Sequence, residues 1–357
     1  MKVLFSTFPF VVDADHSVAL SFLLTTMARR ALDFAPMHAF DSPTAGTGKS
    51  MITDIVSIIA MGDRAGVIPH TENVQEFDKL LSSILMSVPL DNCEGPLKGV
   101  LLSQTLTQAV VLCRILGKSE HVPVRTNATV TANGNNLVIE GDITRRAICG
   151  RMDAGVERPE LLKFEYSPLD DAMNNRPELV ICALTILRAY HLAGRPSRET
   201  LGSFQQWSNL VRGSLLWLGE PDPAATMEEL RRNDPRQLGL KTVMVEWVDQ
   251  FKCDTRVNVS TMIERANRWE REIGFRFPAW RDALMQVAGV GSAVNNRKLG
   301  TWLGKNKNRP MVFHDKPQQG KERRVTLKII EESKSMGRQM WVLQKKEEFI
   351  EKQEQLL

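Results

Sequence analysis

Cysteine and histidine are scarce in this chain, and neither is spaced as metal ligands are. The sequence has five cysteines, an odd number, and six histidines among 357 residues. Zinc sites use ligands that recur a few residues apart, and small secreted scaffolds use paired cysteines. The sequence therefore predicts no zinc site, and it favours buried free thiols in a reducing cytoplasm. The cysteines are widely scattered, at Cys93, Cys113, Cys149, Cys182 and Cys253.

Long apolar runs are also missing. A helix that crosses a bilayer needs about 18 or more consecutive apolar residues, and the sequence contains no such run. The run 1–12 is apolar with one lysine, like the start of a signal peptide, but Asp13 and Asp15 follow without a small-residue cleavage site. We therefore expect no contact with a membrane, no export and a cytoplasmic location.

The chain otherwise has an ordinary globular composition, with 43% hydrophobic and 25% charged residues. Its length suits two or three domains. The net charge is only +4, but the range 276–328 holds twelve Lys/Arg against three Asp/Glu, a local charge of +9 that leaves about −5 for the rest. A basic end on a mildly acidic body predicts a polyanionic partner for that end.

The strongest motif is a loop of small residues between an apolar run and a run with helical spacing. Such a loop turns backbone N–H groups toward a phosphate, and the following helix presents its positive dipole end to the same anion. We expect Lys49 to reach the β- and γ-phosphates of ATP and the Ser50 hydroxyl to bind Mg²⁺. The motif departs from GxxxxGK[ST] at its first position, and a plain glycine-rich turn is the alternative. The loop reads Pro43-Thr44-Ala45-Gly46-Thr47-Gly48-Lys49-Ser50.

The residues on either side of the loop suit a strand before it and a helix after it. The run 37–40 is short and apolar, as a strand leading into a P-loop would be. Gly62 is a helix stop at a suitable distance. Apolar residues recur at helical spacing between these points, at Ile52, Ile55, Val56 and Ile59.

A P-loop ATPase also needs a carboxylate at the end of a neighbouring strand to hold Mg²⁺, and a group to orient the attacking water. Asp91 follows the run 84–90 and fits the metal-binding role. The common Asp-Glu pair is absent, because the chain continues Asn92-Cys93-Glu94, so either Glu94 or Asn92 would orient the water. A polar turn after a strand is the alternative.

Two further polar features follow along the chain. The run 132–136 is rich in asparagine and follows an expected strand, where an amide beside the P-loop would help to position the water. Asparagine–glycine pairs also form turns, which is the alternative for this run. Arg145 and Arg146 precede a β-like run, where they would reach the nucleotide of a neighbouring subunit or lie on the solvated surface.

The order of these pieces resembles the AAA+ helicase module of primase–helicases. These proteins are carried by bacterial prophages and integrative elements and are related to superfamily 3 and MCM-like replicative helicases. The resemblance covers roughly residues 7–250. It rests on the loop 43–50 and on the runs 90–94, 106–108, 132–137, 142–146 and 188–196.

The resemblance implies an ATP- and Mg²⁺-dependent DNA helicase of mobile-element DNA replication, assembled as a homo-oligomeric ring, expected to be a hexamer. Relatives usually carry a primase region ahead of the ATPase, whereas Met1 lies almost directly before it here. We expect single-stranded or forked DNA as a partner, a primase in trans, and either a stand-alone helicase subunit or the surviving half of a longer reading frame. The sensor 2 arginine is not placed. The resemblance assigns Lys49 and Ser50 to Walker A, Asp91 to Walker B, Asn135 to sensor 1, and Arg146 or Arg145 to the arginine finger.

The basic C-terminal stretch resembles a winged helix. DNA would accept the second, basic helix in its major groove, with the wing on phosphates. A solvated basic cap is the alternative. The expected elements are helices at 277–287 and 295–305 around a turn at 289–291, then a β-like run at 311–313, a polar turn at 317–324 and a strand at 339–343. The residues expected to contact DNA are Arg297, Lys298, Lys305, Lys307, Arg309, Lys321, Arg323 and Arg324.

The predicted fold class is α/β. Further helices are expected at 17–32, 74–86, 180–192 and 204–218, with strands at 109–116 and 127–131. Trp207, Trp217 and Trp247 are expected in the core. The predicted domains are a P-loop AAA+ core with a parallel sheet flanked by helices (1–165), a helical subdomain (166–272), a winged-helix domain (273–345) and a charged, helical tail (346–357).

Two functions stay open at this point. The first is an ATP-driven DNA motor whose sites are completed by a neighbouring subunit. The second is a nucleotide-gated DNA-binding switch, or a remnant of the larger enzyme, that turns over little ATP. The missing Asp-Glu pair and the missing primase region favour the second modestly, and unwinding of a forked duplex separates the motor from the switch.

Overall fold

The computed structural model describes residues 1–64, 66, 68–69, 88–91, 93, 96–114, 121–161, 166–196, 200–314 and 321–351. It divides into two compact units, Met1–Asp234 and Pro235–Leu357. This single boundary lies inside the range expected for the helical subdomain, so domain limits at 165 and 272 stay predictions. The expected helix at 74–86 lies outside the described residues.

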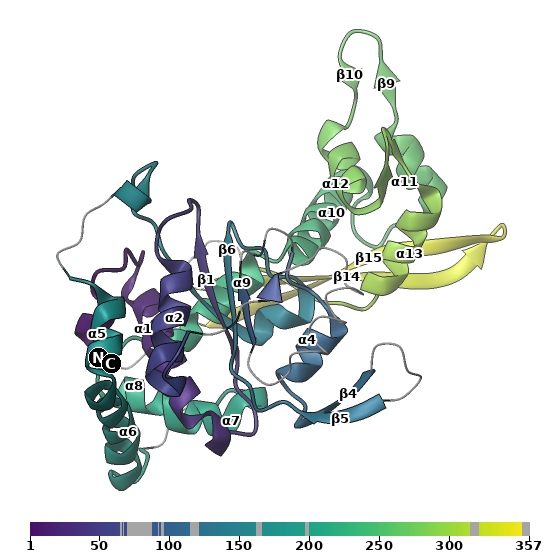
Figure 1. Ribbon diagram of the computed structural model, residues 1–357. Coiled ribbons are helices and arrows are strands. Elements are labelled where there is room, and N and C mark those ends of the chain that lie inside the picture. Colours follow the sequence, from purple (N-terminus) through teal and green to yellow (C-terminus); the bar gives the residue numbers. More distant parts are fainter. Residues whose placement is uncertain are drawn as a thin grey trace. The chain divides into compact units, whose positions relative to one another are not determined.

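A parallel β-sheet forms the centre of the first unit (Figure 1). Its five strands run in the order β2-β3-β6-β1-β7, and every neighbouring pair is parallel. The carboxyl ends of β1, β3 and β6 therefore meet at one edge of the sheet, which is where open α/β sheets bind ligands. The strands are β1 (Met37–Ser42), β2 (Ile68–Pro69), β3 (Val88–Asp91), β6 (Val130–Asn135) and β7 (Ala147–Arg151).

Side chains along β1 alternate between two cores, because successive strand residues point to opposite faces of a sheet. Phe40 packs into one core, which helices α1, α2, α5 and α6 complete. Met37 and Ala39 pack into the other, together with Leu102 of α4 and Leu230 of α9. Helices thus cover both faces of the sheet. Their bounds are α1 (Asp13–Ala28), α2 (Lys49–Met61), α4 (Val100–Thr105), α5 (Pro168–Asn174), α6 (Arg176–Leu192) and α9 (Thr226–Arg232).

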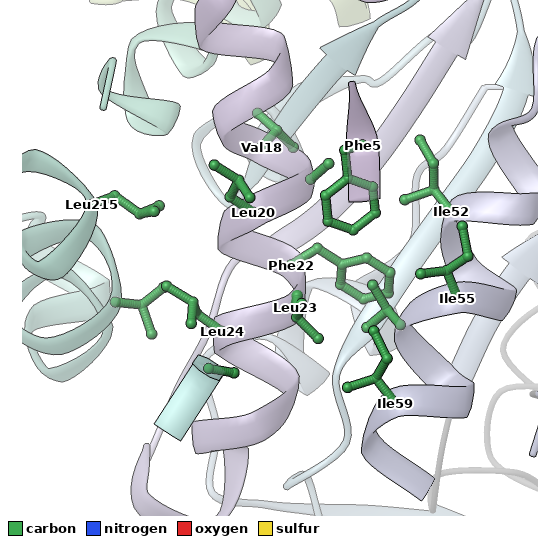
Figure 2. Close-up of a cluster of buried hydrophobic side chains, with 14 of the residues drawn as sticks. Phe5, Val18, Leu20, Phe22, Leu23, Leu24, Ile52, Ile55, Ile59 and Leu215 are labelled. Atoms are coloured by element: carbon green, nitrogen blue, oxygen red, sulfur yellow. The ribbon is translucent and has the colours of Figure 1, made fainter. Parts of the chain in front are cut away.

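Helix α2 confirms the run predicted after the loop. It begins after Gly48 and ends at Gly62, whose φ of 91° is the left-handed conformation that glycine adopts at helix ends. Ile52, Ile55 and Ile59 are fully buried against α1, as Figure 2 shows. Burying each of these side chains contributes about 1.5–3 kcal/mol, so the helix that carries the loop is firmly anchored.

The strand expected at 109–116 forms, but not in the parallel sheet. Strand β4 (Val110–Arg114) pairs antiparallel with β5 (His121–Arg125) as a separate ribbon. Leu112 is 67% exposed on it, so this apolar alternation does not mark a core strand. The base of the ribbon is tied to the 3-10 helix that follows α1 (Arg29–Ala31), because the Arg29 guanidinium donates to the carbonyl oxygens of Leu32, Thr126 and Ala128 at 2.6, 2.5 and 2.8 Å.

The helical run expected at 204–218 is divided into α7 (Gln205–Trp207), a π-helical turn (Ser208–Arg212) and α8 (Gly213–Trp217). At Gly213 an added Cβ would lie 2.3 Å from Tyr190 Oη, so glycine is what lets Tyr190 pack there. Trp207 is fully buried and donates to Thr25 Oγ1 at 2.8 Å, as expected of a core residue. Trp217 is 39% exposed, which corrects its expected burial.

The second unit packs helices around the fully buried Trp247 and Trp280. The expected pair of basic-domain helices is present as α12 and α13. A four-stranded antiparallel sheet, in the order β13-β14-β15-β8, completes this core. The helices are α10 (Pro235–Phe251), α11 (Val259–Ala266), α12 (Pro278–Ala288) and α13 (Asn296–Asn306). The strands are β8 (Val257–Asn258), β9 (Trp269–Glu270), β10 (Gly274–Phe275), β11 (Gly289–Val290), β12 (Ala293–Val294), β13 (Met311–His314), β14 (Lys321–Ser335) and β15 (Arg338–Glu351).

Strands β14 and β15 correct two expectations. The run 321–324, expected to be turn, begins β14 and pairs with the end of β15. Leu327 and Ile329 alternate into the core with a strand period of two, which overrides the polar turn signal. The tail expected to be helix continues β15 to Glu351, because pairing with β14 supplies its backbone hydrogen bonds despite the Glu- and Lys-rich sequence. Residues 352–357 lie outside the described part.

Candidate nucleotide-binding site and basic surface

The predicted P-loop lies between β1 and α2, and two of its glycines are required by geometry. Gly46 and Gly48 have φ of 81° and 92°, which side chains other than glycine rarely adopt. An added Cβ at Gly48 would lie 2.8 Å from Phe8 Cε1, so space excludes it too. Pro43 is not in the left-handed region. The turn there is closed by Ser42, whose Oγ donates to Thr44 O at 2.9 Å, so the loop does not require glycine at its first position.

Lys49 brings the loop and β6 together. Its Nζ donates to Asn135 Oδ1 at 2.8 Å, to Thr44 O at 3.1 Å and to Thr47 Oγ1 at 3.2 Å. The side chain is buried, whereas Ser50, next along α2, is exposed. The predicted phosphate-binding lysine and the predicted water-positioning asparagine thus converge, although 86 residues separate them.

The end of β6 is held beside the loop by two residues that the sequence did not reveal. Asp41 Oδ1 accepts the Leu137 N–H at 2.7 Å, and Thr53 Oγ1 accepts from Asn133 Nδ2 at 3.1 Å. The sequence signal that could have identified Asp41 was its position at the end of the apolar run that forms β1. Gly134 has no room for a side chain, since an added Cβ would lie 2.8 Å from Cys93 O.

A cavity of about 500 Å³ opens between the loop and the end of β6. It combines the amino end of α2, an ammonium and amide groups, which together suit a phosphate chain. The chemistry of Mg²⁺ also fits, because the metal prefers oxygen ligands and Ser50 supplies a hydroxyl at this edge. The cavity is lined by Ala45, Gly46, Thr47, Gly48, Lys49, Ser50, Met51, Asn133, Gly134 and Asn135.

The remaining predicted metal and water ligands are only partly placed. Asp91 ends β3, where Leu90 is level with Ala132 of β6, and Ala132 is level with Ala39 of β1. By this register Asp91 is level with Phe40, two residues before β1 ends, and the metal-binding role of Asp91 stays a prediction. Asn92 and Glu94 lie outside the described residues.

A second cavity of about 250 Å³ adjoins the loop and shares Gly46–Gly48 with the first. Phe8, Met51, Pro159 and Pro168 make its wall mainly apolar, as a site for a flat organic ring would be. Tyr166 also lines it and donates to Asp171 at 2.6 Å; burial and this bond raise the pKa of Tyr166 and keep it neutral. Sequence reasoning missed this cavity because its walls come from three distant segments.

Arg146 lies at the opposite edge of the sheet from the P-loop. Its backbone O accepts from Met37 N, at the start of β1. Its guanidinium contacts Asp142 at 2.6 Å, Ser103 Oγ at 2.6 Å and Thr107 Oγ1 at 2.9 Å. Burial alone would raise the pKa of Asp142. The hydrogen bonds from Arg145 and Ser103 and the charges of both arginines outweigh this effect, and the pKa of Asp142 is lowered.

This placement separates Arg146 from the P-loop of its own chain. A role at a nucleotide would therefore require a second copy of the chain. Only 14% of the Arg146 side chain is exposed, while Arg145 is 52% exposed and pairs with Asp142. The arginine-finger role of either residue stays a prediction.

Helix α13 carries three of the eight predicted DNA-binding residues. Leu299 and Leu303 are fully buried, and Arg297, Lys298 and Lys305 are exposed on the other side. The Asn295 side chain caps the helix by accepting from Lys298 N at 2.9 Å. A groove of about 600 Å³ beside α13 is lined by Arg297, Gly300 and Gly304 and by residues of α11, β14 and β15, but not by Lys298 or Lys305.

The other predicted DNA contacts are partly engaged within the chain. Lys307 pairs with Glu331 at 2.6 Å, and Arg323 pairs with Glu347 at 2.7 Å. Arg309 is partly buried, Arg324 lies on β14 opposite Glu348, and the side chain of Lys321 is outside the described part. Arg297, Lys298 and Lys305 of α13 are thus exposed members of this set for which no ion pair within the chain is described.

Comparisons with known proteins find no matching family model and no matching curated protein. Among solved structures, this chain is similar to the A-form apo structure of the NrS-1 C-terminal region, with a TM-score of 0.36 and 14% identity over 66% of this chain and 52% of that one. A second structure of that region, residues 305–718, gives 0.37 and 13% identity over 66% and 51%. The chain spans about half the length of these structures, and scores at this level do not establish a shared fold.

The described residues lack two further features. No helix there has the length and apolar composition that crossing a membrane requires. Within the same residues, no group of three or more His, Cys, Asp or Glu side chains is arranged to hold a metal ion.

Proposed function

We propose that this chain is an ATPase of the P-loop AAA+ type that drives a DNA helicase or translocase. The observation that carries the proposal is the 2.8 Å hydrogen bond between Lys49 Nζ and Asn135 Oδ1, at the carboxyl edge of a parallel sheet. A phosphate held by Lys49 would lie beside an uncharged amide that can position water for attack. Bound Mg²⁺ would neutralise charge on the phosphates, with Ser50 and Asp91 holding it.

The rest of the fold supports a shared active site and DNA as the partner. Arg146 lies at the edge away from its own P-loop, as a residue that acts on a neighbouring subunit would. Helices α12 and α13 followed by β13, β14 and β15 have the element order of a winged helix, with basic residues on the second helix. A homo-oligomeric ring, expected to be a hexamer, would combine these parts.

Hydrolysis of ATP by the purified chain, with and without single-stranded DNA, tests the proposal. We expect turnover that rises with DNA and that Lys49→Ala abolishes, because Lys49 is the lysine that lines the cavity beside the loop. Lys98→Ala, a partly exposed lysine away from the cavity, is the matched control and should behave as the wild type. Undiminished turnover by Lys49→Ala would remove the P-loop assignment.

A mixing experiment tests whether sites are shared. Lys49→Ala and Arg146→Lys should each be inactive alone, since lysine does not reproduce the planar guanidinium. In a mixture, an intact loop from one variant meets an intact arginine from the other, so part of the activity should return. Because Arg146 also holds Asp142 and Ser103, thermal unfolding of Arg146→Lys must match the wild type first. No recovery would place Arg146 outside the site.

A nucleotide-gated DNA-binding switch is the second candidate, and one observation favours it. The common Asp-Glu pair is missing, because Asp91 is followed by Asn92 and Cys93. Such a protein would bind ATP tightly, change its DNA affinity and hydrolyse almost nothing. Unwinding of a forked duplex by the wild type would exclude it, whereas nucleotide-dependent assembly without turnover would support it.

A further inference from the structure

A short ribbon in the second unit exposes an unusual amount of apolar surface. Strands β9 and β10 project beyond α11 and α12 (Figure 1) and are joined through the turn 271–273. Trp269 is 61% exposed, Ile273 is 66% exposed and Phe275 is 37% exposed. None of these belongs to the predicted DNA contacts. Large aromatic groups on a projecting ribbon indicate a contact site more readily than a packing role.

Trp269 and Phe275 form an aromatic pair that is supported by Arg281 of α12. Trp269 meets Phe275 edge to face, with ring centres 5.5 Å apart and an angle of 77°. The Arg281 guanidinium lies 4.1 Å from the centre of the Phe275 ring, and it donates to Asn267 Oδ1 at 2.5 Å and to Ser292 O at 2.6 Å. The ribbon is thus fastened to the turn between α12 and α13, so Trp269 is presented with little freedom to lose on binding.

The charge around the ribbon is positive and carried entirely by arginine. The range 265–281 contains five arginines, two glutamates and no lysine. Arg276 pairs with Glu270 at 2.8 Å, and Arg265 stacks on Phe277 at 4.2 Å. Arg268 and Arg271 are exposed, and they lie one and two residues from Trp269 along the chain. An exposed indole flanked by guanidinium groups combines a stacking surface with phosphate-binding groups.

We infer that the β9–β10 ribbon binds unpaired DNA, with one base stacked on Trp269 and the neighbouring phosphates held by Arg268 and Arg271. Single-stranded DNA fits better than a protein partner, because the surface has both exposed aromatic faces and charge complementary to a polyanion. It also fits better than duplex DNA, whose bases are already stacked on each other. This site is separate from Arg297 and Lys298 on α13, and it rests on the proposed function only in taking DNA as the polymer.

Fluorescence anisotropy of a labelled oligo(dT), titrated with the full chain, tests the inference. We expect Trp269→Ala to weaken binding roughly 5- to 100-fold, as removal of one stacked base does, and Trp269→Phe to keep most of the affinity. Trp217→Ala, at an exposed tryptophan of the first unit, should bind as the wild type. A blunt duplex should be bound equally by the wild type and by Trp269→Ala.

Three results would overturn the inference. They are no binding of oligo(dT) by the wild type, unchanged binding by Trp269→Ala, and equal losses of affinity for oligo(dT) and duplex in a variant that unfolds at the wild-type temperature. ATP hydrolysis without DNA separates this inference from the proposed function, since Trp269→Ala should leave it unchanged. If the wild type binds oligo(dT) through Trp269 but hydrolyses no ATP, the proposed ATPase motor is contradicted and the inferred DNA site on the ribbon is supported.

Discussion

The side chain of Asn135 joins two parts of the site, because its oxygen accepts from Lys49 Nζ while its backbone ends β6. Asn135→Ala removes this acceptor and the amide that would hold the attacking water. We expect ATP hydrolysis to fall roughly 100-fold, as for removal of one positioned polar group, with nucleotide affinity nearly unchanged. Steady-state hydrolysis and titration with a fluorescent nucleotide measure the two effects. Asn136→Gly, at the adjacent residue with φ of 50°, is the control and should stay active.

We expect His38 to make the stability of the fold depend on pH, independently of the candidate site. It is fully buried on β1, its Nε2 lies 3.1 Å from Ser21 Oγ, and burial lowers its pKa from 6.5 to about 3. In the unfolded chain His38 binds a proton as the pH falls below 6.5, whereas in the folded chain it stays neutral down to about pH 3. The stability linked to His38 is therefore complete above pH 6.5 and is lost as the pH falls toward 3.

The expected size of this effect at pH 5 is about 2 kcal/mol of unfolding free energy relative to pH 7. Urea unfolding of the wild type and of His38→Gln at both pH values measures it. The variant should be less stable at pH 7 but lose about 2 kcal/mol less on acidification. Equal acid losses in the two proteins would contradict a neutral buried His38. His191→Gln, at an exposed histidine, should lose as much stability as the wild type.

At the scale of elements, the loop between β1 and α2 depends on Gly48 for both conformation and space. Gly48→Ala would strain a φ of 92° and push Cβ against Phe8, so we expect nucleotide affinity to fall at least tenfold as the loop shifts. Gly155→Ala is a matched control, since its φ of 64° imposes strain but no atom lies near the new Cβ. It should lose about 1 kcal/mol of stability and keep its affinity. Equal affinities for the two variants would argue against a tightly fitted loop.

Elements with one strong local signal could be predicted from the sequence. Strand β1, helix α2 and its stop at Gly62 followed from periodicity and glycine, and so did α12 and α13. The pairing of strands could not be predicted, because it depends on residues distant in sequence. Thus 109–116 was expected in the parallel sheet, and the tail was expected to be helix because Glu and Lys favour helices when no partner strand is considered.

The parts of the candidate site that lie in short sequence motifs could be predicted. The loop, Asp91 and Asn135 were found in this way, and the structure brings Lys49 and Asn135 together. Asp41 and the apolar cavity at Phe8 were missed, because each acts through a neighbour from another segment. Trp269 was also missed, because neither its exposure nor its packing against Phe275 can be recognised from the spacing of neighbouring residues in the sequence.

At the scale of the whole molecule, uneven charge should make DNA binding depend on salt. Removing a single side chain that binds phosphate lowers the slope of log affinity against log salt by about one. We expect Arg297→Ala and Lys298→Ala each to reduce the slope for duplex DNA by this amount, because both lie on the exposed face of α13. Anisotropy titrations from 50 to about 200 mM salt measure the slope. Arg232 is exposed at the end of α9, and Arg232→Ala should leave the slope unchanged. Unaltered slopes for the α13 variants would instead support the alternative, a solvated basic cap that does not bind DNA.

The tie between Arg29 and the base of the β4–β5 ribbon has an engineering consequence. Three main-chain carbonyls converge on one guanidinium, so the chain re-enters β6 at a fixed point whatever the ribbon does beyond it. The length of the ribbon is thereby uncoupled from the parallel sheet. We therefore expect that a fluorescent label or an affinity peptide can be grafted between β4 and β5 while the sheet edge that carries the loop keeps its geometry. This ribbon would then be a suitable attachment point for single-molecule work.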